Sequence, residues 1–226
     1  PSIIYTTKNF NGTYRRLNGT GGVIDTITNP YLTDNDVEWI NPLVMDPNDP
    51  EKLYMASHTK GLWRLSNAST ARDSDWVQCC QNPGLITAIG ISKSQPNTVF
   101  IGRNGGGNIF RIEGADTTSS TYHVIDCDPL NLMNNGYSNC IYVDPSDVNH
   151  VFVCFTNYNA KNIYESHNAT SASPTWEAVD GDLPNVPVHW LAQHPTNSHV
   201  AYIATEIGVF YCDSLAGDST HWHIAN

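Results

Sequence analysis

The chain has 226 residues, with 22 acidic against 11 basic side chains and a formal net charge of −11. Nucleic acids and anionic membrane surfaces are bound through clusters of Lys and Arg, so this charge balance excludes both as expected partners. No apolar run is long enough for a membrane-spanning helix, and no membrane insertion is expected.

Residues 1–20 are the first predicted structural unit. The segments IIYTT and TYRRL are separated by a short polar loop and match the third and fourth strands of the units that follow, so a half blade is expected here. Residues 21–38 are rich in Thr, Asn, Gly and Asp, have no clear periodicity and are expected to form a long connector. Such excursions often carry binding residues, and a plain surface insertion is the alternative.

Residues 39–226 repeat one pattern four times, over about 39–80, 85–127, 138–180 and 188–226. The first strand appears as NPLVMDP, TAIGISK, NCIYVDP and HWLAQHP, and the steps between equivalent positions are 46, 52 and 50 residues. The second strand is LYMA, VFIG, VFVC and AYIA, and the third is LWRL, IFRI, IYES and VFYC. Repeats of about 40 to 50 residues with four short strands are typical of β-propeller blades.

The strand composition favours a propeller over a β-sandwich. A half-buried strand alternates apolar and polar residues, whereas CIYV and VFVC are apolar at consecutive positions, which indicates burial on both faces. A sandwich would not explain four copies in register. The predicted fold is therefore all-β, a β-propeller with four complete four-stranded blades and an N-terminal half blade.

The half blade has no first and second strands at either end of the sequence. An unpaired strand edge is unfavourable in water. We therefore expect either a piece of a larger propeller or a partner that completes it, through a protein partner or self-association at the half blade.

Two cysteines are candidates for a disulfide. A hairpin centred on Asp147 places Cys140 directly opposite Cys154, close enough for an S–S bond. The alternative is a pair of small buried apolar residues. Cys79, Cys80 and Cys127 fall near the ends of fourth strands, which allows one bridge between neighbouring blades.

The composition is typical of secreted proteins. Charged residues make up only 15% of the chain, which is rich in small polar residues, so an extracellular location is expected. Four Asn-x-Ser/Thr sequences are candidate glycosylation sites, although chance alone yields about as many; they are Asn11, Asn18, Asn67 and Asn168.

Three aromatic residues are not echoed in the other repeats: Tyr31, Trp39 and Trp190. Exposed aromatic rings stack on sugars, so carbohydrate is a candidate ligand, with ordinary packing as the alternative. In the connector, Asp34, Asp36 and Glu38 offer oxygen atoms at alternating positions, which suits calcium. The nine His residues form no HExxH pair and no CxxC occurs, so a zinc site is not predicted.

Other charged residues recur at repeat positions. Arg64 and Arg111 are equivalent, and a solvated blade face is the expected location. Asp46 and Asp144 start equivalent hairpin turns, which is ordinary turn chemistry. None of these is predicted to be catalytic.

Several segments resemble a known repeat family. TKNFNGTY at residues 7–14, and SHN at 166–168 with PTW at 174–176, resemble degenerate Asp-box turns. Residues 181–211 resemble the linker, strand pair and GVF strand of BNR-type propeller repeats, and residues 41–56 are similar to another element of them. Relatives with such repeats include sialidases, xyloglucan-type endoglucanases and sortilin-like receptors. The resemblance implies a propeller but no catalytic residue, because Asp-boxes are folding elements.

The expected function is that of a non-catalytic extracellular scaffold or interaction and assembly module. The alternative is part of a secreted polysaccharide-active glycoside hydrolase, which needs two carboxylates across a cleft that the sequence does not assign. No cofactor besides calcium is expected.

Overall fold

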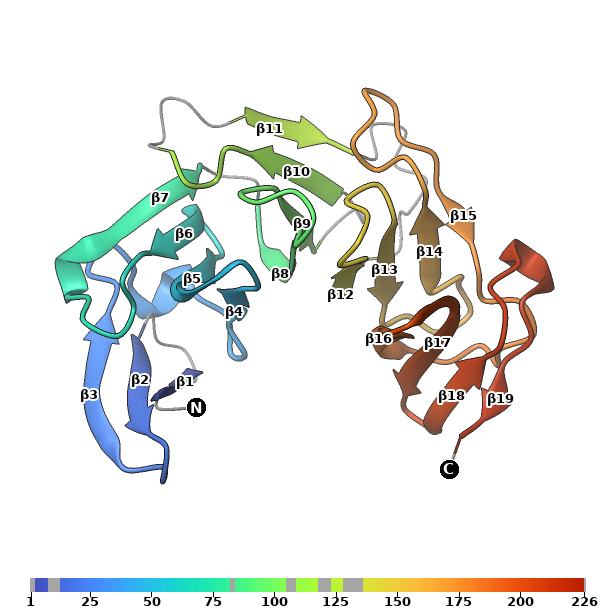
Figure 1. Ribbon diagram of the computed structural model, residues 1–226, viewed down its shortest axis with the longest axis horizontal. Helices are drawn as coiled ribbons and strands as arrows, with labels where there is room; N and C mark the ends of the chain where they lie inside the picture. Colours follow the sequence, from blue (N-terminus) through green and yellow to red (C-terminus); the bar gives the residue numbers. More distant parts are fainter. Residues whose placement is uncertain are drawn as a thin grey trace. The chain divides into compact units, whose positions relative to one another are not determined.

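The computed structural model describes residues 3–7, 13–81, 84–104, 109–117, 123–127 and 136–225. These residues form 19 strands in five sheets and three short 3-10 helices (Figure 1). The 3-10 helices are η1 (Asp34–Asp36), η2 (Asp73–Asp75) and η3 (Gly217–Ser219). Within this described part of the chain, no helix is long and apolar enough to cross a membrane.

The first sheet has three strands and the others have four. The strands of the first two sheets are β1 (Ile3–Thr7), β2 (Thr13–Asn18), β3 (Val23–Thr28), and β4 (Leu43–Asp46), β5 (Asp49–Ser57), β6 (Gly61–Leu65), β7 (Trp76–Cys80). The third sheet is β8 (Ile86–Ile91), β9 (Val99–Arg103), β10 (Ile109–Glu113), β11 (His123–Asp126). The fourth and fifth are β12 (Ser138–Val143), β13 (Val151–Phe155), β14 (Ile163–Ser166), β15 (Glu177–Ala178), and β16 (Val188–His194), β17 (Asn197–Thr205), β18 (Gly208–Cys212), β19 (His223–Ile224).

Strands are hydrogen-bonded in chain order within every sheet, so each sheet is a meander. Each of the four repeats predicted from the sequence corresponds to one four-stranded sheet. The predicted hairpin register is also confirmed, because Cys140 lies opposite Cys154 and Tyr142 opposite Phe152.

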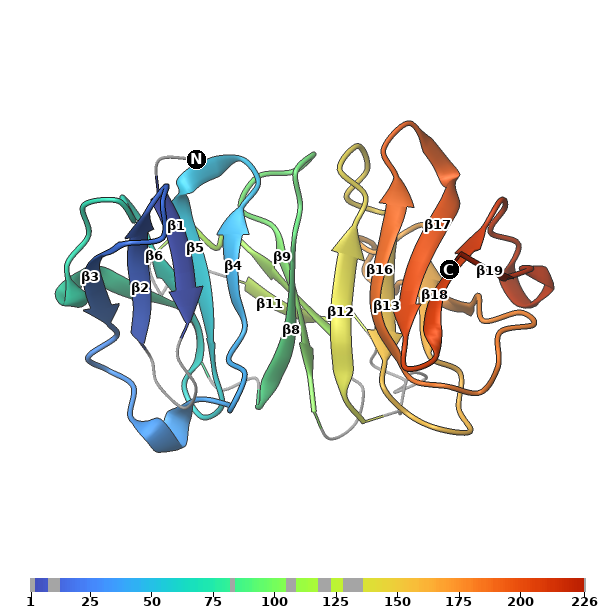
Figure 2. The ribbon, with the colours of Figure 1, turned by 90° about the horizontal axis from the view of Figure 1, so that it is seen from below.

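The first sheet differs from the expected half blade. Residues 21–38 were expected to be a connector, but they supply β3, and β2 pairs with both β1 and β3 (Figure 2). The Nη1 atom of Arg16 on β2 donates to the Ala68 carbonyl, as that of Arg64 on β6 donates to the Ala115 carbonyl. This shared contact identifies β2 as a third strand rather than a fourth. The segment VIDTIT gave no clear apolar signal because only Ile27 is buried and three of its six residues are exposed.

The chain divides into two compact units, residues 1–86 with 112–123, and residues 87–111 with 124–226. In the first unit, Tyr14 is fully buried and meets Tyr5 and Trp76 edge to face, with ring centroids 5.6 and 6.0 Å away. It belongs to a core that joins β2 and β3 to β5, β6 and β7. Aromatic packing therefore attaches the first sheet to the second.

In the second unit, the sheet β12–β15 is buried on both faces. Val151, Val153 and Phe155 pack in one cluster, and Phe152 and Cys154 pack in another with residues of β16–β18. All five side chains of β13 are fully buried. The consecutive apolar residues of VFVC therefore have the two-sided burial that the sequence predicted.

The expected solvated position of the repeat arginines is wrong. Arg64 and Arg111 are only 9% and 3% exposed. Arg64 Nη1 donates to the Ala115 carbonyl and Arg111 Nη1 to the Ala169 carbonyl, each at 2.7 Å. Each guanidinium thus satisfies a carbonyl in the loop after the third strand of the neighbouring sheet, which compensates for its burial.

The predicted disulfides are not formed. All six cysteines are free and buried. Cys79 and Cys127, candidates for a bridge between blades, direct their thiols toward the Ala115 and Ala169 carbonyls, at 3.2 and 4.0 Å. These thiols therefore share an acceptor with the buried arginines.

Candidate functional site

The repeat changes its chemistry in the sheet β12–β15. The third-strand position that holds Arg64 and Arg111 in earlier sheets holds Glu165 here, which lies on β14. The start of the second strand changes too, since His150 occupies the place that Lys52 has in the second sheet. The basic pair of the second sheet is thus replaced by a histidine and a carboxylate in the sheet β12–β15.

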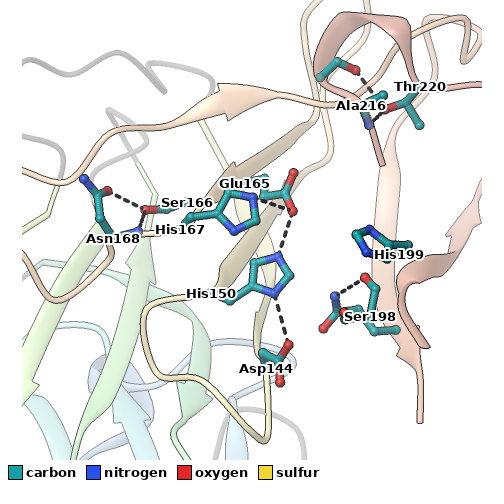
Figure 3. A network of polar contacts seen from close by, with 12 residues as sticks. Asp144, His150, Glu165, Ser166, His167, Asn168, Ser198, His199, Ala216 and Thr220 are labelled. Atoms are coloured by element: carbon teal, nitrogen blue, oxygen red, sulfur yellow. Dashed lines mark hydrogen bonds and ion pairs between the residues drawn. The ribbon is translucent and has the colours of Figure 1, made fainter. Parts of the chain in front are cut away.

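His150 lies between two carboxylates (Figure 3). Its Nδ1 atom is 3.0 Å from Asp144 Oδ2, and its Nε2 atom is 2.7 Å from Glu165 Oε1. The other oxygen of Asp144 accepts the Ser146 N–H at 2.8 Å, as expected for a residue that starts a turn. The turn therefore fixes Asp144 and, through it, the ring of His150.

His167 completes the group, which we name the histidine–carboxylate cluster: Asp144, His150, Glu165 and His167. Its Nε2 atom is 3.3 Å from Glu165 Oε1, and its ring stacks on that of His150 with centroids 4.5 Å apart. The first three residues are buried, whereas the His167 side chain is 72% exposed. The cluster therefore joins three buried residues to an exposed outer imidazole.

The charges of the buried members depend on each other. Burial acts to lower the pKa of His150, but its hydrogen bonds to Glu165 and Asp144 outweigh that effect and raise the pKa above its ordinary value. Burial acts to raise the pKa of Asp144, and hydrogen bonds from Ser146 and His150 lower it overall. The arrangement favours an imidazolium that donates from both ring nitrogens.

A polar pocket of about 360 Å³ opens onto the cluster. Its lining residues are Asp144, Ser146, Asp147, His150, Glu165, His167, Ser198, His199 and Leu215. Figure 3 shows His199 of β17 on the opposite side of the pocket from His150. Two imidazole nitrogens and a carboxylate oxygen lie within 4.8 Å of one another, and among the described residues this is the one such group of three potential metal ligands.

The aromatic residues predicted as ligand-binding are all exposed. Tyr31 is 48%, Trp39 55% and Trp190 60% exposed. The Tyr31 ring stacks on that of Trp63, with centroids 5.1 Å apart and an interplanar angle of 10°. Tyr31 and Trp39 belong to the first unit and Trp190 to the second. Carbohydrate binding by them stays a prediction.

The predicted calcium ligands are engaged within the protein. Asp36 is buried, accepts hydrogen bonds from Thr33 and Thr59, and lies 3.0 Å from Lys60 Nζ. These contacts, that of Thr59 foremost, hold the pKa of Asp36 well below its ordinary value. Asp34 is exposed in η1, and Glu38 lies 3.4 Å from His58. The described structure does not gather the three carboxylates into one group.

The glycosylation candidates have different surroundings. Asn18 and Asn67 are exposed, whereas Asn168 is half-buried and its Oδ1 atom accepts the Thr175 N–H at 2.8 Å. Asn168 therefore stabilises the turn in which the sequence resembles an Asp-box. Asn11 lies outside the described residues. Glycosylation stays a prediction.

Sequence reasoning missed the histidine–carboxylate cluster. Its members come from the turn between β12 and β13, from β14 and from the residue after β14, at spacings that match no metal or catalytic motif. The signal that could have found it is the replacement of arginine by Glu165 at a repeat position, two residues before His167. In the hairpin β13–β14, Glu165 pairs with Phe152, two residues from His150.

No family model matches the chain, and no curated protein matches it. Solved structures do. A chain of the COPII outer coat vertex on membranes aligns with a TM-score of 0.70 at 9% identity, over 96% of this chain and 57% of that one. The dihydro-heme d1 dehydrogenase NirN in complex with DHE aligns with a TM-score of 0.58 at 13% identity, over 97% of this chain and 43% of that one. The GH74 enzyme of Niastella koreensis aligns with a TM-score of 0.59 at 15% identity, over 98% of this chain and 37% of that one.

The chain thus spans between 37% and 57% of the length of these three proteins. At such low identities the likeness concerns the fold alone, and activities do not transfer with it. The sheets and these matches together establish an all-β fold of the β-propeller type.

Proposed function

We propose that this chain is a non-catalytic β-propeller scaffold, an extracellular interaction and assembly module. The observation that carries the proposal is the exposed outer face of the last sheet, which we name the terminal face: Trp190, Ala192, Tyr202, Ala204, Val209 and Tyr211. Trp190 pairs with Ala204, and Tyr202 pairs with Tyr211, so these side chains share one side of the sheet.

The terminal face corresponds to a buried face of the preceding sheet. Matching NCIYV to HWLAQ places Trp190 at the position of Cys140, and matching VFVC to AYIA places Tyr202 at that of Phe152. Cys140 and Phe152 are 2% and 0% exposed because the sheet β16–β19 covers them. Trp190 and Tyr202 are 60% and 41% exposed. Among the described residues, no sheet covers this stacking surface of the last sheet.

Stacked repeats bury a continuous core, so an uncovered apolar blade face favours association. Removing apolar surface from water stabilises a complex by roughly 25 cal/mol per Å². The partner that fits is another sheet with apolar side chains, as β16–β18 provide for β12–β15.

A second copy of this chain offers such a sheet. On the outer side of the first sheet, Ile4 pairs with Leu17, which pairs with Val23, so the three share a face. Ile4 and Val23 are 36% and 59% exposed. We propose that the terminal face of one copy covers this face of the next.

The edge of the first sheet supports the same role. Among the described residues β1 pairs with β2 alone, and the sheet has three strands where the others have four. An apolar pocket of about 330 Å³ lies beside it, lined by Ile3, Ile4, Tyr5, Leu43, Met45 and Leu53. An added strand at β1 would pair with the free edge and fill this pocket. The proposal includes such strand addition.

The remaining parts of the proposal rest on the sequence. The low charge content supports an extracellular location, and exposed Asn18 and Asn67 are the proposed glycan acceptors. Membership of the BNR-type repeat proteins is proposed from the segment resemblances, supported by the Asp-box-like turn at Asn168.

Sedimentation velocity on the 226-residue chain, from about 1 to 100 μM, tests the proposal. We expect concentration-dependent association that Trp190→Ser and Tyr202→Ser weaken. Trp39→Ser removes an equally exposed Trp outside the terminal face and serves as the matched control. A monomer over the whole range, or equal effects of all three substitutions, contradicts the proposal. Turnover on a polysaccharide panel, detected at reducing ends, would instead support a hydrolase.

A further inference from the structure

We propose that His150, Glu165 and His167 bind one divalent first-row transition-metal ion. The potential ligand atoms are one ring nitrogen from each histidine and one carboxylate oxygen, all within 4.8 Å of one another. The site is independent of the proposed assembly role, because none of its residues belongs to the terminal face.

The spacing of the ligand atoms suits a single ion after small adjustments. Ligands at about 2.0 to 2.2 Å from a tetrahedral zinc ion stand roughly 3.3 to 3.6 Å apart. Glu165 Oε1 lies 3.3 Å from His167 Nε2 and 2.7 Å from His150 Nε2. The exposed His167 side chain has room to move, whereas His150 and Glu165 are held by their burial.

Asp144 prepares His150 as a ligand. Metal-bound histidines usually donate their second ring N–H to a carboxylate, which fixes the ring and its tautomer. Asp144 Oδ2 is 3.0 Å from His150 Nδ1 and supplies this contact. On binding, the ion takes the place of the proton on His150 Nε2, and that proton leaves to solvent. The proton on Nδ1 stays on the ring and is donated to Asp144.

The change from the second sheet removes two charges that would repel a cation. In the second sheet, Arg64 and Lys52 occupy the positions of Glu165 and His150. No Lys or Arg is among the residues that line the pocket beside the cluster, and Asp147 adds a further carboxylate. The sheet β12–β15 therefore combines nitrogen ligands with net negative charge.

The ligand types select the class of metal. Imidazole nitrogens favour zinc, copper, nickel and iron, whereas calcium and magnesium prefer sites made of oxygen. Three protein ligands leave at least one coordination position of the ion open, and the pocket provides an entry path for the ion. His199 lies on the opposite side of this pocket and is a candidate fourth ligand.

The competing explanation is a charge network without metal, in which His150 bridges two carboxylates. Isothermal titration calorimetry of tag-free protein with Zn²⁺ distinguishes a metal site from a metal-free charge network. The absorption spectrum of added Co²⁺ is a second readout. We expect one bound ion per chain. His167→Ala should weaken binding by about 100-fold or more, and Asp144→Asn by about 10- to 100-fold.

His221→Ala is the matched control. His221 is exposed and its Nδ1 atom lies 3.0 Å from Asp182 Oδ2, so it is another surface histidine with a carboxylate partner. This variant should bind Zn²⁺ like the wild type, and circular dichroism should report the same fold for all variants. No stoichiometric binding by the wild type, or equal binding by His167→Ala and wild type, overturns the proposal. Equal losses in His167→Ala and His221→Ala overturn it as well.

Discussion

Phe152 and Tyr202 occupy the same place in consecutive repeats, so one substitution at both positions tests the repeat assignment directly. Phe152 is fully buried in the core between two sheets, and Tyr202 is 41% exposed on the terminal face. We compare Phe152→Ala with Tyr202→Ala in the chain at low concentration. Both residues belong to the second unit, so one unfolding transition reports on both.

The expected magnitudes differ because only one substitution leaves a cavity. Truncating a buried Phe to Ala lowers the free energy of unfolding by about 3 to 5 kcal/mol, through lost transfer energy and the cavity left behind. Tyr202 loses mainly its cross-strand contact with Tyr211, whose ring centroid is 6.1 Å away. Such a pair contributes roughly 0.2 to 1 kcal/mol. We therefore expect a difference of about 2 to 5 kcal/mol between the variants.

Urea denaturation followed by tryptophan fluorescence measures both free energies. The m-value should stay unchanged, so that the shift in midpoint reports stability alone. Equal losses for the two variants, or a larger loss for Tyr202→Ala, would refute the claim that the terminal face is an uncovered copy of the buried one.

Three further predictions concern the scaffold. Arg111→Met should lower the free energy of unfolding by about 1 to 3 kcal/mol, because the Ala169 carbonyl loses its charged donor. The control Arg15→Met, at an exposed position, should change that free energy by less than about 0.5 kcal/mol. Urea denaturation measures both. The lowered pKa of Asp36 contributes stability at neutral pH that is lost as the pH falls below the ordinary carboxyl range. Asp36→Asn should therefore have a lower melting temperature than the wild type at pH 7, and its melting temperature should fall less on acidification. Gly181→Ala should destabilise the chain by more than about 1 kcal/mol, because φ is +50° and the added Cβ would collide with the Thr220 carbonyl oxygen; a melting temperature equal to wild type would contradict this.

The repeat of apolar strands made the sheets predictable from sequence. Strands such as VFVC are apolar at successive positions because both faces are buried, and that periodicity is visible without a structure. The strand β3 was not predictable in this way, because only Ile27 of VIDTIT is buried and its pairing with β2 leaves no apolar pattern.

Contacts between residues far apart in the sequence account for the other features that the sequence analysis predicted wrongly or missed. A repeat arginine suggests a solvated face unless the acceptor is known, and Arg111 meets a carbonyl 58 residues away. The histidine–carboxylate cluster depends equally on the register of β13 and β14, which brings Glu165 beside His150. The register of Cys140 and Cys154 was predictable from turn symmetry, but the oxidation state of their thiols was not.

The central claim is that the terminal face is an association surface. Hydrogen–deuterium exchange of the wild-type chain at low and high concentration tests it most directly, because covering a sheet face slows exchange of the amides in its strands. We expect peptides of β16–β18 and of β1–β3 to gain protection at high concentration, while those of β4–β7 do not. Unchanged protection of β16–β18, with association detected in the same samples, would contradict it.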